Sequence, residues 1–220
     1  MSALLTDRYD TMPWEQIDNV VFDVGNVLIV FDPVYMLRVL FPDETLLQSK
    51  LMDVIFRSPY WVMLDRGVIT PAQAAEQMAK RAPELLPEIL HTLNNWSNLI
   101  RPIPEGVRAM ECAKAHGKKV FLLSNYNDVF FVQAQALCPF LNPPMVDGMI
   151  ISAHVHINKP DPVIYRTLCD KYSLIPDRTV FVDDSAGNVE GALHAAWQGI
   201  WKDTEGRLAE FMGFSLPQEV

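Results

Sequence analysis

The 220-residue sequence has little cysteine, a deficit of positive charge and no long apolar run. Its three cysteines, Cys112, Cys138 and Cys169, are odd in number and far apart, which predicts free thiols in a reducing, cytoplasmic compartment. Lys and Arg number 18 against 27 acidic residues, so no nucleic-acid partner is expected. No run of about 18 apolar residues occurs, and the N-terminus lacks a signal-peptide pattern, so we expect neither a membrane span nor export.

Half of the residues are apolar and a fifth are charged, a composition typical of a globular protein with a buried core. Three apolar runs of strand length end in polar side chains: Asn19–Phe22 before Asp23, Val120–Leu123 before Ser124, and Thr179–Val182 before Asp183. Unbroken apolar strands are typical of a parallel sheet, which needs helical crossovers between its strands. Helix signals cover residues 105–116, 162–172 and 188–199. The pattern therefore predicts an α/β fold with a doubly wound parallel sheet.

The stretch from Pro33 to about Arg101 differs, because it carries helix signals and no apolar strand run. Candidate helices cover residues 35–41, 45–56, 71–81 and 87–99, and Thr70 before Pro71 is a typical helix start. We therefore predict a core of residues 15–32 and 103–220 and an inserted all-helical cap of residues 33–102. Ligands of open α/β sheets bind at the carboxyl ends of the strands, so an insertion after the first strand would act as a lid.

Polar side chains at the carboxyl ends of the predicted strands should converge at one edge of the sheet. They are Asp23, Ser124 with Asn125, and Asp183 with Asp184, joined by Lys159 from the loop 158–162. Three neighbouring carboxylates need a cation among them, and hard oxygen ligands suit Mg²⁺. Carboxylate, metal, ammonium, hydroxyl and amide groups together suit phosphoryl transfer, in which Asp23 would be the attacking nucleophile.

Four segments in order resemble the four motifs of the haloacid dehalogenase superfamily: Val21–Leu28 (VFDVGNVL), Leu123–Asn125, Lys159–Tyr165 and Phe181–Asn188. The resemblance extends from about residue 18 to about residue 200 and includes a helical cap after the first strand. Within the superfamily the chain is similar to small bacterial sugar-phosphate phosphatases whose first motif reads F-D-x-G-N-V. The resemblance implies a Rossmann-like core and a phosphomonoesterase acting on a small phosphate ester, a sugar phosphate, through an aspartyl-phosphate intermediate.

The resemblance also implies roles for individual residues. Asp23 would be the nucleophile and a Mg²⁺ ligand. Further metal ligands would be the backbone carbonyl of Gly25 and the carboxylates of Asp183 and Asp184. The phosphate would be bound by Ser124, Asn125 and Lys159. Asn188 has two interpretations, because it could orient an acidic neighbour or cap the helix that follows.

Gly25 departs from the common pattern, because most phosphatases of this superfamily carry there a second Asp that acts as general acid and base. Gly cannot transfer a proton, so either another group substitutes or the leaving group departs easily, as from a sugar 1-phosphate. Asp32 or a cap residue could take over the proton transfer. In the cap, residues Asp65–Gly67 could form a substrate-facing loop in which Arg66 contacts the substrate. Trp96 could stack on a sugar ring or fill the cap's own core.

Three alternative functions stay open at this stage. A haloacid dehalogenase would tolerate Gly25, because its Asp attacks carbon without a general acid, but the pair Asp183–Asp184 is not expected there. A phosphomutase shares the aspartyl-phosphate chemistry but normally keeps the second Asp of the first motif. A non-catalytic sugar-phosphate-binding domain would hold its ligand and Mg²⁺ without turnover.

Overall fold

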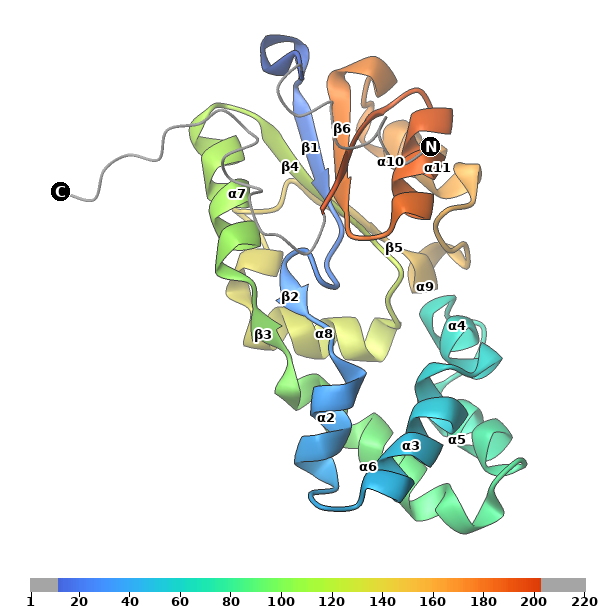
Figure 1. Cartoon of the computed structure of the whole chain (residues 1–220). Helices are drawn as coiled ribbons and strands as arrows, with labels where there is room; N and C mark the ends of the chain where they lie inside the picture. The colour runs from blue at the N-terminus through green and yellow to red at the C-terminus, as the bar shows by residue number, and fades with distance from the viewer. Residues whose placement is uncertain (1–11, 203–220) are drawn as a thin grey trace, which may run out of the picture.

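The computed structural model describes residues 12–202 and contains a five-stranded parallel sheet in the order β5-β4-β1-β6-β7 (Figure 1). The strands are β1 (Asn19–Phe22), β4 (Lys119–Ser124), β5 (Gly148–Ile151), β6 (Thr179–Asp183) and β7 (Gln198–Trp201). The central strand β1 pairs in parallel with β4 on one side and β6 on the other. The predicted α/β fold with a parallel sheet is thereby confirmed.

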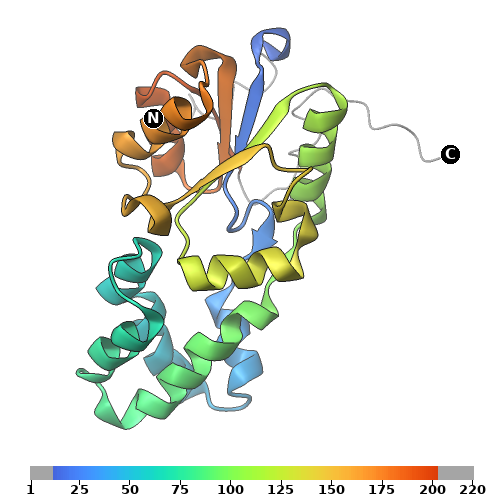
Figure 2. The ribbon, with the colours of Figure 1, turned by 180° about the vertical axis from the view of Figure 1, so that it is seen from behind.

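Helices cover both faces of the sheet, because alternate residues of a strand point to opposite sides. Val20 and Phe22 belong to the apolar cluster on the face of α7 (Pro104–Ala115) and α8 (Asp128–Leu137). Val21 belongs to the cluster on the opposite face, where α10 (Pro162–Tyr172) and α11 (Ala186–His194) pack. Figure 2 shows the same sheet from behind. All three side chains are fully buried, which explains the unbroken apolar run of β1.

A separate helical block of residues 33–99, here called the cap, follows β1 along the chain and lies beyond the carboxyl ends of the strands (Figure 1). It contains α2 (Pro33–Leu40), α3 (Thr45–Leu51), the π-helical η3 (Met52–Phe56), α4 (Pro59–Asp65), α5 (Pro71–Ala79), η4 (Pro83–Leu85), α6 (Leu86–Asn95) and η5 (Trp96–Leu99). Two short antiparallel strands, β2 (Ile29–Val30) and β3 (Arg101–Pro102), connect the cap to the core. The remaining elements are η2 (Trp14–Gln16), η6 (Pro139–Leu141), α9 (Ser152–Val155) and η7 (Pro176–Arg178).

Local capping signals account for where several helices begin. Thr70 and Gln73 form a reciprocal capping box at the start of α5, as the Thr-Pro pair predicts. Asp32 accepts a hydrogen bond from the backbone N–H of Tyr35 and so caps α2. No helix within residues 12–202 has the length and apolarity that crossing a bilayer requires.

The structure corrects the sequence analysis at several short elements. The helix predicted over residues 188–199 is too long, because α11 ends at His194 and β7 begins at Gln198. Ala196 between them has a left-handed backbone (φ 63°), which no helix continues through. The strands β2, β3, β5 and β7 and the helix α4 were not predicted. Each is only two to seven residues long, and strands of this length depend on pairing with distant segments.

We expect Gly106→Ala to destabilise the protein, because a Cβ at this position would lie 2.0 Å from the backbone oxygen of Val27. Val27 belongs to the loop after β1, so the close approach of α7 also supports the segment that carries Asp23. The expected loss is about 1–3 kcal/mol in the free energy of unfolding, measured by urea denaturation. The matched control is Gly187→Ala in α11, whose Cβ meets only Ser185 Oγ at 3.9 Å, and which should not destabilise. Equal stabilities of the two variants would contradict the packing argument.

Candidate active site

Three acids from neighbouring strand ends meet at one edge of the sheet. Asp23 follows β1, and Asp183 ends β6, whose residues lie in register with those of β1. Asp184 follows directly, and one carboxylate oxygen from each of the three acids lies within 4.8 Å of the others. Ser124, at the end of β4, borders the same pocket. The predicted convergence of these side chains is confirmed.

A buried lysine lies between two of these acids. Lys159 Nζ is 2.8 Å from Asp23 Oδ1 and 2.7 Å from Asp183 Oδ2, and the lysine side chain is 1% exposed. Burial alone would lower the pKa of Lys159, but the two carboxylates outweigh it and raise that pKa. The ammonium therefore stays charged at neutral pH and supplies a fixed positive charge beside Asp23.

Asn125 holds the backbone of Lys159 in place. The Asn125 side chain accepts a hydrogen bond from Lys159 N (2.7 Å) and donates one to Lys159 O (3.1 Å). Asn125, which the sequence analysis assigns to phosphate binding, therefore also positions Lys159. The contact of Asn125 with phosphate stays a prediction. Asn127, and neither Ser124 nor Asn125, caps the N-terminus of α8.

Both carboxylate oxygens of Asp183 already accept hydrogen bonds from other groups of the protein. It is fully buried, and its Oδ1 accepts from Ser185 N (2.7 Å) and Asn188 Nδ2 (3.1 Å). Its Oδ2 accepts from Lys159 Nζ (2.7 Å) and again from Asn188 (3.1 Å). Of the two interpretations of Asn188, the orientation of an acidic neighbour is the one observed.

Asp23 and Asp184 both border the pocket and keep oxygens available to it. Burial raises the pKa of Asp23 to about 6, although the nearby Lys159 ammonium opposes this. Burial, followed by the charge of Asp183, also raises the pKa of Asp184. Apart from its ion pair, Asp23 Oδ1 is buried without a hydrogen-bond partner in the part of the chain that is described. Two carboxylates that are costly to ionise and lie side by side fit the donor set of a divalent cation such as Mg²⁺.

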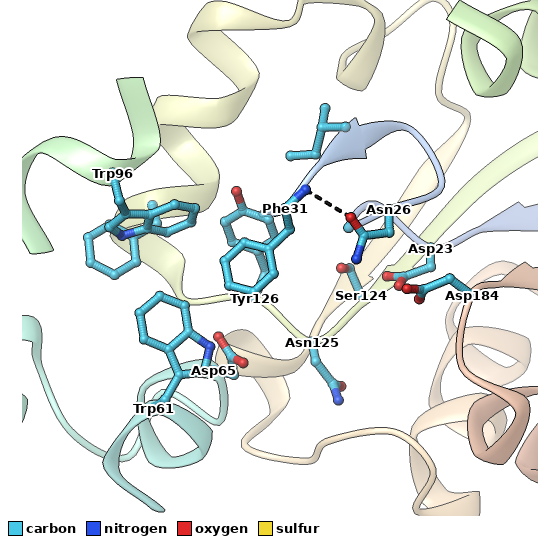
Figure 3. Close-up of a pocket in the computed structure, with 13 residues that line it drawn as sticks. Asp23, Asn26, Phe31, Trp61, Asp65, Trp96, Ser124, Asn125, Tyr126 and Asp184 are labelled. Atoms are coloured by element: carbon cyan, nitrogen blue, oxygen red, sulfur yellow. Dashed lines mark hydrogen bonds between the residues drawn. The ribbon is translucent and has the colours of Figure 1, made fainter. Parts of the chain in front are cut away.

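The pocket above these acids has a volume of about 240 Å³ and is walled mainly by aromatic side chains (Figure 3). Its lining beyond the acids, Ser124 and Asn125 consists of Gly25, Asn26, Ile29, Phe31, Trp61, Asp65, Trp96, Tyr126 and Phe130. Phe31 stacks on Trp61 with ring centroids 5.7 Å apart, and Trp61 meets Trp96 edge to face at 5.6 Å. Trp96 is 2% exposed, so it serves the core of the cap and the pocket wall together.

Sequence reasoning placed Asp65 in a substrate-facing loop but assigned the contact with the substrate to Arg66, which is not among the residues that line the pocket. Asp65 ends α4 and borders the pocket, whereas the Arg66 guanidinium donates to the backbone oxygen of His156 (2.8 Å). Ser58 followed by Pro59 is a helix-start signal that could have revealed α4. Asp32, the acid suggested from the sequence, caps α2 and is not among the residues that line the pocket.

Comparison with known proteins gives a family match and several distant relatives. Residues 17–196 match the hydrolase family described as haloacid dehalogenase-like hydrolase. A sesquiterpene phosphatase of Aspergillus oryzae, AstK, is 24% identical over 180 residues, which cover 82% of this chain and 87% of that protein. An (S)-2-haloacid dehalogenase of Burkholderia cepacia is 28% identical over 117 residues, which cover 53% of this chain and 50% of that enzyme.

Solved structures share the fold at low sequence identity. The HAD family enzyme BT-2542 of Bacteroides thetaiotaomicron, in complex with magnesium and inorganic phosphate, superposes with a TM-score of 0.66 at 19% identity, over 88% of this chain and 98% of that chain. The L-2-haloacid dehalogenase of Xanthobacter autotrophicus superposes with a TM-score of 0.61 at 18% identity, over 83% of this chain and 76% of that chain. Because the family match spans most of the sequence, the chain belongs to the haloacid dehalogenase-like hydrolases.

Proposed function

We propose that the protein is a Mg²⁺-dependent phosphomonoesterase that acts through an aspartyl-phosphate on Asp23. The observation that carries this proposal is the buried Lys159 ammonium shared by Asp23 and Asp183, with Asp184 beside them at the pocket. Phosphoryl transfer needs positioning and neutralisation of charge, and a fixed ammonium next to a nucleophilic carboxylate supplies both. The phosphatase relative supports the same reaction class.

In this proposal the core residues divide the work on the phosphoryl group. The carboxylate of Asp23 attacks phosphorus, while Lys159 and Ser124 bind the oxygens of the phosphoryl group. Asn125 contributes by fixing the backbone of Lys159, in addition to the contact with phosphate that the sequence predicts.

Mg²⁺ would be held by the carboxylates of Asp23 and Asp184 and by the backbone carbonyl of Gly25. When bound, Mg²⁺ neutralises charge on the phosphoryl oxygens. Asp183 fits this set less well than Asp184, because both of its oxygens already accept hydrogen bonds from Lys159, Asn188 and Ser185. We therefore infer that Asp183 acts on the site by holding Lys159.

The alcohol half of the ester would lie against the aromatic walls. Trp96 Nε1 and Tyr126 Oη are buried without hydrogen-bond partners among residues 12–202, so they are available to polar groups of a substrate. Rings of this kind stack on the apolar face of a sugar, as the predicted sugar phosphate requires. They also suit an apolar alcohol, and the similarity to a sesquiterpene phosphatase supports a terpenyl phosphate as the second candidate.

The alternative of a dehalogenase is less well supported by the geometry. Asp184 borders the pocket beside Asp23, and an extra carboxylate there would repel a carboxylate substrate unless a cation separates them. A non-catalytic binding domain would bind the same groups without releasing phosphate, so a measurement of turnover separates it from the proposed enzyme.

Asp23→Asn is expected to lower phosphate release by at least about 10³-fold, because an amide cannot form the aspartyl-phosphate. The measurement is phosphate release from p-nitrophenyl phosphate, glucose 1-phosphate and a sesquiterpenyl phosphate, with Mg²⁺ and with EDTA. The matched control, Asp18→Asn, alters an exposed acid just before the same strand, where Asp18 pairs with Arg178, and should retain activity. Turnover that survives in Asp23→Asn or in EDTA would contradict the mechanism.

Mg²⁺ affinity is expected to weaken as the pH falls through about 6, because a proton on Asp23 must leave before the cation binds. Below the pKa of Asp23, the apparent affinity should fall by up to about tenfold per pH unit, and well above it the dependence should flatten. Isothermal titration calorimetry with Mg²⁺ on either side of this pKa gives the affinities. Asp184→Asn should weaken binding at every pH, and an affinity independent of pH would exclude Asp23 as a ligand.

Lys159→Met is expected to lower the free energy of unfolding by about 3–5 kcal/mol, because it leaves the fully buried Asp183 carboxylate without its cation. Adding Asp183→Asn should recover part of this loss, since the uncompensated charge is then removed. Arg57→Met, which breaks an exposed ion pair with Asp53, is the control and should cost less than about 1 kcal/mol. Urea denaturation measures all of these, and equal losses in the two single variants would refute the buried-pair argument.

A further inference from the structure

The core of this site lacks a group that can give a proton to the departing alcohol. Gly25 has no side chain, and a Cβ built there would meet nothing closer than Phe31 Cβ at 4.0 Å, so the position borders open space. Lys159 is committed to two carboxylates, and Asp32 caps α2. An alkoxide leaving group would therefore depart without help from these residues, which would slow the reaction by about 10²–10⁴-fold.

We propose that Asp65, at the end of α4 in the cap, is the catalytic residue that protonates the leaving oxygen and then accepts a proton from water. This inference rests on the proposed phosphomonoesterase function. Asp65 is the one acid that the cap contributes to the lining of the pocket. Figure 3 shows its carboxyl group on the cap side, next to Trp61, while Asp23 and Asp184 lie on the core side. A phosphate ester bound at Asp23 would thus direct its alcohol half toward Asp65.

No bond to another part of the described protein explains why the carboxyl group of Asp65 lies at the pocket. Within residues 12–202 it forms no hydrogen bond or ion pair, and the contact with Ser152 Oγ is made by the backbone oxygen of Asp65. A partly buried acid without a partner costs stability, so its presence facing the pocket indicates a role toward a ligand.

The end of α4 is held firmly against the core. Core side chains bond to the carbonyls of its last turn and of the residue that follows, in addition to the backbone N–H groups of Arg66 and Gly67 that bond to Val62 O and Leu64 O. The contacts are Asn158 Nδ2 to Val62 O (3.2 Å), Asn127 Nδ2 to Leu64 O (3.1 Å), Ser152 Oγ to Asp65 O, and His156 Nδ1 with Arg66 O (3.1 Å). Gly67 follows with φ 68°, and a Cβ there would lie 2.5 Å from Ala153 O. These contacts fix Asp65 relative to the nucleophile, as a catalytic group requires.

The charges around Asp65 favour its protonated form. The charged groups that act on Asp65 are Asp23 and Lys159, both from the core, while Asp23 and Cys138 act on Tyr126 beside it. Arg66, the first residue after α4, turns its guanidinium toward His156 O. Burial and then the charge of Asp23 raise the pKa of Asp65, and Lys159 opposes this only in part. A carboxyl group held in this way can donate a proton near neutral pH.

The two half-reactions then balance. In the first, an Asp23 oxygen bonds to phosphorus, the bond from phosphorus to the alcohol oxygen breaks, and the Asp65 proton moves to that oxygen. In the second, the Asp65 carboxylate takes a proton from water as the water oxygen attacks phosphorus and the bond to Asp23 breaks. Inorganic phosphate leaves, and Asp65 is protonated again.

The test compares p-nitrophenyl phosphate with benzyl phosphate, two substrates of similar shape whose leaving groups differ in basicity. Nitrophenolate departs without a proton, whereas benzyl alcohol needs one. Asp65→Asn should lower kcat/KM for benzyl phosphate by about 10²–10⁴-fold and for p-nitrophenyl phosphate by less than about tenfold. Asp32→Asn is the matched control and should leave both rates unchanged, because Asn also caps a helix. Thermal unfolding of Asp65→Asn and Asp65→Ser verifies that both variants fold.

The outcomes separate this inference from the proposed function. Equal losses on the two substrates, or no loss on either, would overturn the role of Asp65. Wild-type turnover of p-nitrophenyl phosphate, abolished by Asp23→Asn, with none of benzyl phosphate would also overturn it while the phosphatase proposal stands. A wild-type protein that hydrolyses neither substrate would overturn both.

Discussion

The shared ion pair of Lys159 organises the whole site. Its ammonium lies 2.8 Å from Asp23 and 2.7 Å from Asp183, so two buried carboxylates from adjacent strands are tolerated at one edge of the sheet. The in-register pairing of β1 with β6 makes this closeness unavoidable, because residues that follow paired positions emerge side by side. Two further side chains hold this group of Lys159, Asp23 and Asp183 in place. Asn125 bonds to the backbone of Lys159, and Asn188 bonds to the carboxylate of Asp183.

The molecule separates two chemical tasks between its two parts. The carboxyl ends of the core strands provide charge and hydrogen bonds for a phosphoryl group, whereas the cap and the segments next to it provide rings for the alcohol. These parts meet where α4 ends, because side chains of the core donate hydrogen bonds to carbonyls in the last turn of this helix. The contacts that dock the cap against the core therefore also place the carboxyl group of Asp65 at the pocket.

Local sequence patterns were sufficient to predict the site residues that lie at the ends of strongly apolar strands. Asp23, Ser124 and Asp183 each follow or end a buried run, and a parallel sheet brings such positions to one edge. The family match and the fold confirm the α/β architecture, while the residue roles, the domain boundaries, the cytoplasmic location and the absence of a nucleic-acid partner stay predictions. Sequence reasoning gave Asp65 no role of its own, because α4 has only seven residues and because the distance of a cap residue from Asp23 depends on contacts 60 to 100 positions apart in sequence.

The sequence by itself determined which residues carry charge at the ends of the strands, since apolar runs, capping signals and motif order are local properties. It also determined that position 25 cannot supply a proton for the leaving group, because glycine has no side chain. Only the tertiary structure decided that Asp183 is saturated while Asp184 faces the pocket, because neighbouring residues of an extended chain point in opposite directions. It likewise decided that Asp65 and the aromatic rings face the nucleophile, since this depends on how the cap docks against the core and not on any one segment.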